Sequence, residues 1–552
     1  MRIPGGWRVA LGWTAAAAVP LAFLAVFFAW PVGALVGRGL FPAGTPTLDG
    51  FATVLASPRT ARVITTTLAQ ATAGTLLSLA LGLPAAWVLY RTRFPGRGIV
   101  RSIVTIPFVL PSVVVGVAFK SLVIDTGPLG FLGLDRSFAI VVAALAFFNI
   151  AVVVRTVGGV WASLDPRPGE VAAVLGATPG RVLATVTLPA LGPAIASSAA
   201  LVFLFCASAY GVVMVLGGPA YGTIETEIWF LTNQLLDLTS AAALSVIQLL
   251  VVTVCLVVSE RLQARLTHAQ RLRAGDSAVS RWRLRRDGAA SLVTALIVAF
   301  VALPLGNLVL RSLRTASGWG IDHYATLFGG PSGLLAIPTA DAVGNSLRTA
   351  LAATALALLL GVLVSLVVSR RPRSASGRRA LGLLDQVFML PLGVSAVTVG
   401  FGFLITLNRP PLDLRSSMML VPIAQAIVAL PLVLRVLLPV LRAIDPRLRE
   451  AAAVLGSSPG RVLADVDLAM AARGLGLATG FAFATSLGEF GATSFLARPD
   501  APTLPVVVFR LMGRPGLENQ GTGMAAAVLL AVLTAAVMAL AERMRPMEAT
   551  SW

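Results

Sequence analysis

Charged residues, lysine, histidine and cysteine are all scarce in this sequence. Of its 552 residues, 12% are charged and 57% are hydrophobic, and the mean hydropathy is +0.87. A soluble globular protein carries roughly 25% charged residues, so the composition indicates a membrane protein. The two cysteines, Cys206 and Cys255, lie inside apolar runs where a small hydrophobic side chain is unremarkable. We therefore expect neither a disulfide framework nor a metal site.

The shortage of lysine and histidine excludes the usual catalytic machinery. A phosphate-binding loop needs Gly-Lys followed by Ser or Thr, but the single lysine, Lys120, follows Phe119. The sequence contains no HExxH or GxSxG pattern, and its two histidines are too few for a typical triad or zinc site. A membrane-embedded enzyme is thus disfavoured, and we expect no cofactor bound by this chain.

Long apolar runs are what the sequence has in abundance. About 20 residues are needed to cross ~30 Å of hydrocarbon, and each crossing must be helical because lipid offers the backbone no hydrogen-bond partner. Twelve runs qualify: 10–36, 63–90, 102–124, 137–158, 190–216, 240–259, 290–312, 345–369, 382–407, 417–441, 472–497 and 522–541. The predicted fold is an all-α integral membrane protein with 12 transmembrane helices in two tandem six-helix halves. Pro111 and Pro391 are expected to kink the third and ninth spans.

The net charge of +19 comes from arginines in short loops, which indicates membrane orientation and not nucleic-acid binding. Arginine gathers after the second, sixth and eighth spans, so these loops and both termini are predicted to be cytoplasmic. The alternate loops are predicted to be outside and contain acidic residues: Asp125, Asp135, Glu225, Glu227, Asp322 and Asp341. Residues 261–289 form a basic cytoplasmic linker between halves 1–260 and 290–552.

One polar stretch occurs twice. Residues 165–184 and 445–464 are identical at 15 of 20 positions, at a spacing of 280. In each copy an Asp-Pro pair favours a helix start, and Gly176 or Gly456 favours its end. The sequence therefore predicts two short cytoplasmic helices, at about 165–176 and 445–456. They could merely cap the helix bundle, but matched identities favour a site that is used twice.

These stretches resemble the EAA motif of ATP-binding-cassette (ABC) importer permeases. The motif's glutamate, alanines and glycine match Glu170, Ala172, Ala173, Gly176, Glu450, Ala451, Ala452 and Gly456. The copies depart from it at Val171, where alanine is usual, and at Ala469, where proline is usual. The resemblance implies a type I importer permease-like pseudodimer, with a coupling helix in each half that docks one ATP-binding subunit.

Other motifs resemble the fused permeases of thiamine and iron(III) importers. Arg93–Arg97, Phe147–Asn149 and Leu216–Pro219 are similar to the thiamine branch, whereas Ser486–Gly491 is of a type that both branches share. The resemblance implies import of thiamine or a phosphorylated form, with iron(III) as the alternative. It also implies a bacterial inner-membrane location, an extracytoplasmic binding protein, and two separate ATPase subunits that bind ATP and Mg²⁺.

Three residues near the ends of the fifth and eleventh spans are candidates for the transport pathway. Glu489 has Ala209 as its counterpart, so this acid occurs in one half only and could face a cationic substrate or serve as a structural partner. Tyr210 and Phe490 correspond at a spacing of 280 and could form an aromatic gate or simply pack. An ion-coupled secondary transporter remains a competing class, although such a carrier needs more ionisable groups within its spans.

Overall fold

The computed structural model describes residues 6–41, 49–218, 221–269, 280–329, 338–370, 374–409 and 412–543. Both chain ends, part of the predicted linker (270–279), and Arg371 and Arg373 of the eighth-span loop lie outside the described residues. The two termini, which the sequence predicts to be cytoplasmic, are therefore not among the described residues.

Helices make up nearly all of the described chain. Up to the predicted linker the helices are α1 (Gly6–Leu24), η1 (Ala25–Ala29), α2 (Trp30–Leu40), α3 (Asp49–Ala56), α4 (Pro58–Arg91), α5 (Arg97–Thr105), η2 (Ile106–Val109), α6 (Ser112–Val123), η3 (Gly130–Leu132), α7 (Phe138–Ser163), α8 (Arg167–Val174), α9 (Pro179–Val182), η4 (Leu183–Thr187), α10 (Leu188–Ala207), α11 (Gly211–Leu216), α12 (Ile224–Asn233) and α13 (Leu238–Ala269). The later helices are α14 (Leu284–Ser312), α15 (Asp322–Phe328), α16 (Thr339–Val368), α17 (Ala375–Met389), η6 (Leu390–Gly393), α18 (Ala396–Thr406), α19 (Leu420–Ala443), α20 (Pro446–Val454), α21 (Pro459–Val462), η7 (Leu463–Leu468), α22 (Ala469–Gly488), α23 (Thr493–Leu496), α24 (Leu504–Met512) and α25 (Leu517–Arg543).

Among the described residues, strands occur in three two-stranded pairings, and each strand has two residues. They are β1 (Thr92–Arg93) with β2 (Ser280–Arg281), β3 (Arg314–Thr315) with β4 (Gly318–Trp319), and β5 (Asn408–Arg409) with β6 (Leu412–Asp413). The first pair is parallel and the other two are antiparallel. The all-α prediction is therefore confirmed.

Nine helices in the described ranges are long and apolar enough to cross a membrane. The number reaches twelve, as predicted, if each of three bent pairs forms one span. Two of the bends, of 106° and 93°, lie near Pro111 and Pro391, which were expected to produce kinks. The third pair, which joins residues 459–472 to 474–488, bends by 61°.

Four of the predicted spans are not continuous helices, so the prediction of continuity is wrong for them. Runs 102–124 and 382–407 break between α5 and α6 and between α17 and α18, whereas runs 190–216 and 472–497 break after Ala207 and Gly488. Hydropathy does not reveal these breaks, because the apolar residues continue through them. As a result Glu489 lies just beyond the end of α22, not inside a span helix.

A glycine allows close helix packing at the same place in each half. A Cβ on Gly82 of α4 would lie 2.7 Å from Val153 of α7, and a Cβ on Gly361 of α16 would lie 2.5 Å from Val433 of α19. Both distances are shorter than real side-chain contacts, so only glycine fits without movement. Small residues at helix crossings let backbones approach in this way.

The first helices of each half pack against the other half. α1 contacts α16 and α2 contacts α18, while α14 contacts α4 and α6. The predicted linker is helical at both of its ends, because α13 continues to Ala269 and α14 begins at Leu284. Buried Asp287 fixes the start of α14 by accepting a hydrogen bond from Trp87 Nε1 of α4 (3.1 Å). Helices that precede the predicted linker therefore contact helices that follow it, so the two halves of the chain pack against each other.

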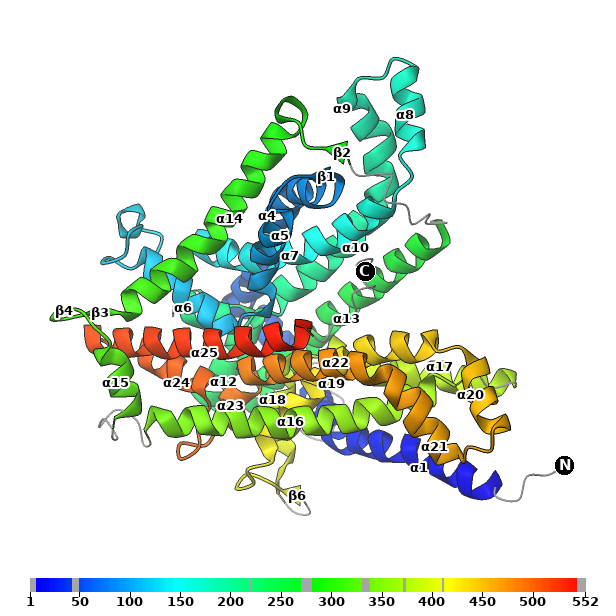
Figure 1. Cartoon of the computed structure of the whole chain (residues 1–552). Coiled ribbons are helices and arrows are strands. Elements are labelled where there is room, and N and C mark those ends of the chain that lie inside the picture. The colour runs from blue at the N-terminus through cyan, green and yellow to red at the C-terminus, as the bar shows by residue number, and fades with distance from the viewer. Residues whose placement is uncertain are drawn as a thin grey trace.

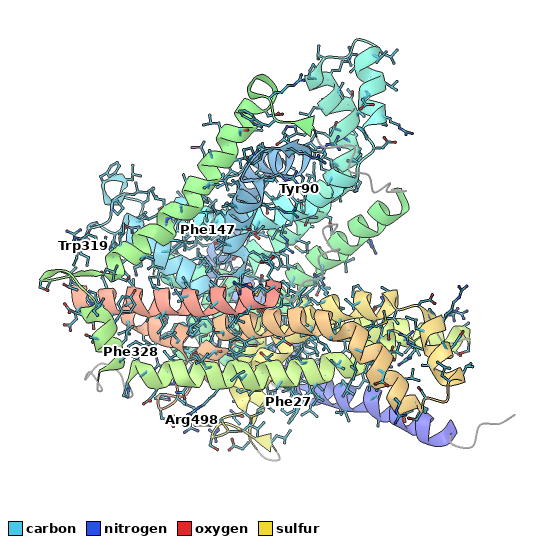
Figure 2. All side chains as sticks on the ribbon, in the orientation of Figure 1. Phe27, Tyr90, Phe147, Trp319, Phe328 and Arg498 are labelled. Atoms are coloured by element: carbon cyan, nitrogen blue, oxygen red, sulfur yellow. The ribbon has the colours of Figure 1, made fainter. Side chains whose placement is uncertain are left out.

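The two copies of the repeated stretch lie far apart. In Figure 1, α8 and α9 lie at the end of one arm, α20 and α21 lie at the end of another, and the arms diverge toward the same side of the molecule. Trp319 and Phe328 lie at the opposite end (Figure 2). The molecule therefore has one end that carries both repeats and another that carries the β3–β4 and α15 region.

Candidate functional site

Short helices are present where the sequence predicts the two coupling helices. Asp445 is the N-cap of α20, as expected, whereas α8 begins one residue later than expected, at Arg167 after Pro166. Asp165 accepts a hydrogen bond from the Arg167 backbone (3.0 Å), and Asp445 does the same from Arg447 (2.9 Å). Gly176 and Gly456 have φ of 87° and 85°, a left-handed conformation that glycine adopts without a Cβ clash.

The end of each coupling helix is a Schellman motif. The backbone N–H of Ala177 donates to the carbonyl of Ala172 and that of Gly176 to Ala173, both at 3.0 Å. The same pair of bonds is made after α20, where Ser457 donates to Ala452 and Gly456 to Ala453. The left-handed glycine therefore turns the chain from each coupling helix toward α9 or α21.

Each coupling helix presents an apolar surface that nothing in the described chain covers. Val174 and Leu175 are 88% and 81% exposed, and Val454 and Leu455 are 86% and 85% exposed. The charged Glu170 and Glu450 are also exposed, whereas Ala172 and Ala452 are half-buried and form the face toward the protein. Two equivalent apolar patches at the ends of the two arms fit a partner that binds twice.

A second site forms where the halves meet. The break after α10 contains Tyr210 and ends where Gly211 begins α11, and the break after α22 contains Phe490-Gly491. A Cβ on Gly211 would meet Ser112 at the start of α6 (2.3 Å), and a Cβ on Gly491 would meet Ala396 at the start of α18 (2.8 Å). In each half, the start of one helix (α6 or α18) therefore packs against the glycine that follows the aromatic residue.

The structure brings Tyr210 and Phe490 together. Their rings stack with centroids 5.3 Å apart and an interplanar angle of 25°. Tyr210 Oη also lies 3.0 Å from Ser494 Oγ, which links the first half to α23. The aromatic contacts continue from Phe490 to Phe509 at 5.3 Å and from Phe509 to Trp229 at 6.4 Å. The two halves of the chain are therefore in direct contact at this aromatic cluster.

Glu489 lies beside this stack, but its carboxylate is fully occupied. Its Oε1 accepts from the backbone of Ala492 (2.8 Å), and its Oε2 accepts from the backbone and hydroxyl of Thr493 (3.0 and 2.6 Å). These bonds cap α23, which is the structural role left open by the sequence. The residue is 7% exposed, and its position next to Phe490 leaves a pathway role open as well.

A second buried acid, Glu225, was missed as a candidate. The prediction that this segment is a loop is wrong: Glu225 is fully buried in α12, where it accepts from Gln248 Nε2 (2.8 Å) and Ser395 Oγ (3.0 Å). Ser395 belongs to the other half and caps α18 by accepting from the Thr398 backbone (3.1 Å). A signal in the sequence was available, because the position 280 residues later is Pro505, so this acid also occurs in one half only.

The chain is similar to permease proteins of known transport systems. A family model described as "Binding-protein-dependent transport system inner membrane component" matches residues 74–271. The thiamine transport system permease protein ThiP of Brucella abortus (strain 2308) is 27% identical over 498 residues, which cover 87% of both chains. ThiP of Escherichia coli (strain K12) is 28% identical, with 84% of this chain and 85% of that protein covered.

A shorter relative and a solved structure match about half of the chain. The sulfate transport system permease protein CysT of Escherichia coli (strain K12) is 30% identical over 246 residues, which cover 43% of this chain and 87% of CysT. The crystal structure of a bacterial ABC transporter involved in the import of the acidic polysaccharide alginate also matches. The match covers 48% of this chain and 97% of the chain in that structure, with 22% identity and a TM-score of 0.39. The identity to CysT over most of its length, together with the family match, places this chain among the binding-protein-dependent transport system inner membrane components, as a permease of an ABC importer.

Proposed function

We propose that this permease imports thiamine, delivered by an extracytoplasmic binding protein and driven by two ATPase subunits bound at α8 and α20. The observation that supports thiamine most directly is the similarity to ThiP proteins along 87% of both chains. Family membership favours this function over an ion-coupled carrier, and it makes the chain a transporter component and not an enzyme.

The contact between the halves suits a cationic aromatic substrate. Glu225 and Glu489 supply two buried carboxylates, and Tyr210 and Phe490 supply aromatic faces that attract cations. A buried acid is costly in a membrane protein and commonly serves the substrate pathway. We place the substrate path between the two halves at this level, with Tyr210 and Phe490 as the gate. Iron(III) remains the alternative cargo, because carboxylates would also attract it.

The ATPase subunits would bind the exposed apolar pairs of the coupling helices. Val174–Leu175 and Val454–Leu455 are equivalent, exposed and carried on diverging arms. ATP and Mg²⁺ would be bound by those subunits. Their closure on ATP would bring the arms together and separate the halves at the Tyr210–Phe490 contact.

The orientation of the chain follows from the same assignment. The end of the molecule that carries α8 and α20 would face the cytoplasm, together with both termini. The opposite end, with Trp319 and Phe328, would then face the binding protein. Arginine-rich loops on the cytoplasmic side agree with this orientation.

Uptake by the reconstituted transporter tests the proposal. The permease, its ATPase subunits and its binding protein are placed in liposomes that contain ATP, and uptake of radiolabelled thiamine is measured with ferric iron as the competing cargo. We expect thiamine uptake that requires both ATP and the binding protein. Uptake of iron alone would refute the thiamine assignment, and uptake driven by a proton gradient without ATPase subunits would refute the ATP-driven mechanism.

A further inference from the structure

Two ion pairs hold the second coupling helix. Asp467 lies in η7 and its side chain is 1% exposed. Its Oδ1 accepts from Arg449 Nε and its Oδ2 accepts from Arg370 Nη2, both at 2.7 Å. A buried carboxylate is stable when it is paired in this way, and charge-assisted bonds of this length are the stronger kind.

The three residues come from separate parts of the second half. Arg449 lies in α20, Asp467 lies two residues before the start of α22, and Arg370 lies two residues beyond the end of α16. Arg449 also donates to the carbonyl of Leu441 in α19 through Nη2 (3.5 Å). One carboxylate and its two arginines therefore join the coupling helix to three long helices.

The first half cannot form the same ion pairs. Gly169 stands at the position equivalent to Arg449, and Thr187 stands at the position equivalent to Asp467. Arg91 corresponds to Arg370 at the spacing of 279 that relates Gly82 to Gly361.

The contacts of Arg91 differ from those of Arg370. It donates to the carbonyls of Trp161 and Leu164, both at 3.4 Å, at the end of α7. Both acceptors precede α8. Arg91 also interacts electrostatically with Glu170 of α8, and α8 packs directly against η4. The first coupling helix is therefore attached by packing and by this arginine, whereas the second is attached through the carboxylate of Asp467.

The difference matters because α22 leads directly to the gate. This helix has 20 residues, about 30 Å along its axis, and bends by 61° after its first turn, between residues 459–472 and 474–488. It begins two residues after Asp467, and Phe490 follows its end by two residues. A movement of α20 that is passed to the start of α22 thus reaches the ring that stacks on Tyr210.

We propose that Asp467 is a positioning residue that makes α20 and α22 move as one rigid unit. Displacement of α20 by its ATPase subunit then withdraws Phe490 from Tyr210, so the second half drives gate opening. α8 lacks this ion-pair link to α10, and the first half follows. The inference rests on the proposed function for the ATPase subunit, whereas the rigidity of the unit can be measured without it.

Hydrogen–deuterium exchange of the purified permease tests the rigidity. Asp467→Asn is expected to raise amide exchange in residues 446–454 by about tenfold, the effect of losing one charge-assisted hydrogen bond, and to leave residues 167–174 unchanged. Asp465→Asn is the matched control, because Asp465 is exposed in the same η7 segment, and Asp467→Glu should restore slow exchange. Equal exchange in wild type and Asp467→Asn would overturn the proposal.

The second experiment measures coupling in the assembled transporter. With thiamine-loaded binding protein, Asp467→Asn is expected to retain the ATPase subunits but to import about tenfold less thiamine per ATP hydrolysed. Asp465→Asn should import as wild type. An unchanged ratio for Asp467→Asn would overturn the positioning role. Failure of the wild-type chain to retain ATPase subunits would instead refute the proposed function, and the exchange result would still stand.

A second pair of variants applies if Asp467→Asn does not fold. Arg449→Gln removes the bonds from the coupling helix to Asp467 and to the carbonyl of Leu441, and it leaves Asp467 paired with Arg370. Arg447→Gln is its control, because Arg447 is exposed on the same helix. Arg449→Gln should show the same fast exchange of α20 and the same low import per ATP. Behaviour identical to that of Arg447→Gln would overturn the proposal.

Discussion

Tyr210 and Phe490 stack on each other with ring centroids 5.3 Å apart, although each belongs to a different half of the chain. Both rings follow a helix that leads from a coupling helix, α10 for Tyr210 and α22 for Phe490. Under the proposed function, movements of α8 and α20 would therefore meet at this stack.

Removing one ring should make the transporter leak. A stacked aromatic pair contributes about 1 kcal/mol beyond its buried area, so Phe490→Ala should raise the population with separated halves about fivefold. The measurement is passive efflux of radiolabelled thiamine from liposomes without ATP. Tyr210→Phe is the control, because it keeps the ring and loses only the bond to Ser494. Efflux from Phe490→Ala equal to that from Tyr210→Phe would contradict a gating role.

The buried acids should affect transport more than assembly. Glu225→Gln and Glu489→Gln each remove a negative charge where the halves meet, so we expect a higher KM for thiamine uptake, by about tenfold for each lost charge-assisted contact. ATPase subunits should still co-purify with both variants.

Thr493→Val is the control for Glu489, since it removes one donor to the carboxylate but keeps the charge. If Thr493→Val impairs uptake as much as Glu489→Gln does, the acid serves only to cap α23.

Close packing at Gly361 should limit stability. A Cβ at this position would lie 2.5 Å from Val433, so Gly361→Ala should lower the free energy of unfolding by about 1–3 kcal/mol. Gly344→Ala in the same α16 is the matched control, because a Cβ there meets nothing within 4 Å. Thermal unfolding in detergent measures both variants. Equal melting temperatures for the two variants would show that α16 and α19 can move apart to accommodate the added Cβ without loss of stability.

The sequence could predict features that depend on neighbouring residues. Apolar runs predicted the all-α fold. The glycine signal predicted the end of both α8 and α20, and the Asp-Pro signal predicted the start of α20 and came within one residue of the start of α8, because caps are local. The spacing of 280 also pairs Tyr210 with Phe490, whose rings stack in the structure.

Features that depend on distant segments could not be predicted. The break beside Tyr210 lies in continuous apolar sequence, and the break at Phe490 contains a single charged residue, Glu489, so a hydropathy average over each run does not locate them. Glu225 follows a Gly-Pro-rich turn and is easily assigned to a loop, yet Ser395 of the other half buries it. The pairing of Asp467 with Arg370 joins residues 97 positions apart, and no local pattern specifies it.

The exposed leucine of each coupling helix should be essential for ATPase binding. Leu455 is 85% exposed, so Leu455→Asp should change the free energy of unfolding by less than about 0.5 kcal/mol. A charge in the centre of an apolar contact should nevertheless weaken retention of the ATPase subunit by about tenfold or more. Leu175→Asp should have the same effect at the first coupling helix, since its side chain is 81% exposed in the equivalent position.

Leu517→Asp is the matched control for both variants. Leu517 is 71% exposed but belongs to the start of α25, outside both coupling helices. Co-purification of the ATPase subunits with each variant is the measurement, and each single variant should leave one subunit bound through the unchanged helix. Full retention by Leu455→Asp and Leu175→Asp would mean that the ATPase docks elsewhere. If Leu517→Asp loses the ATPase subunits to the same extent, the added negative charge weakens binding wherever it is placed, and the coupling helices are not the docking site.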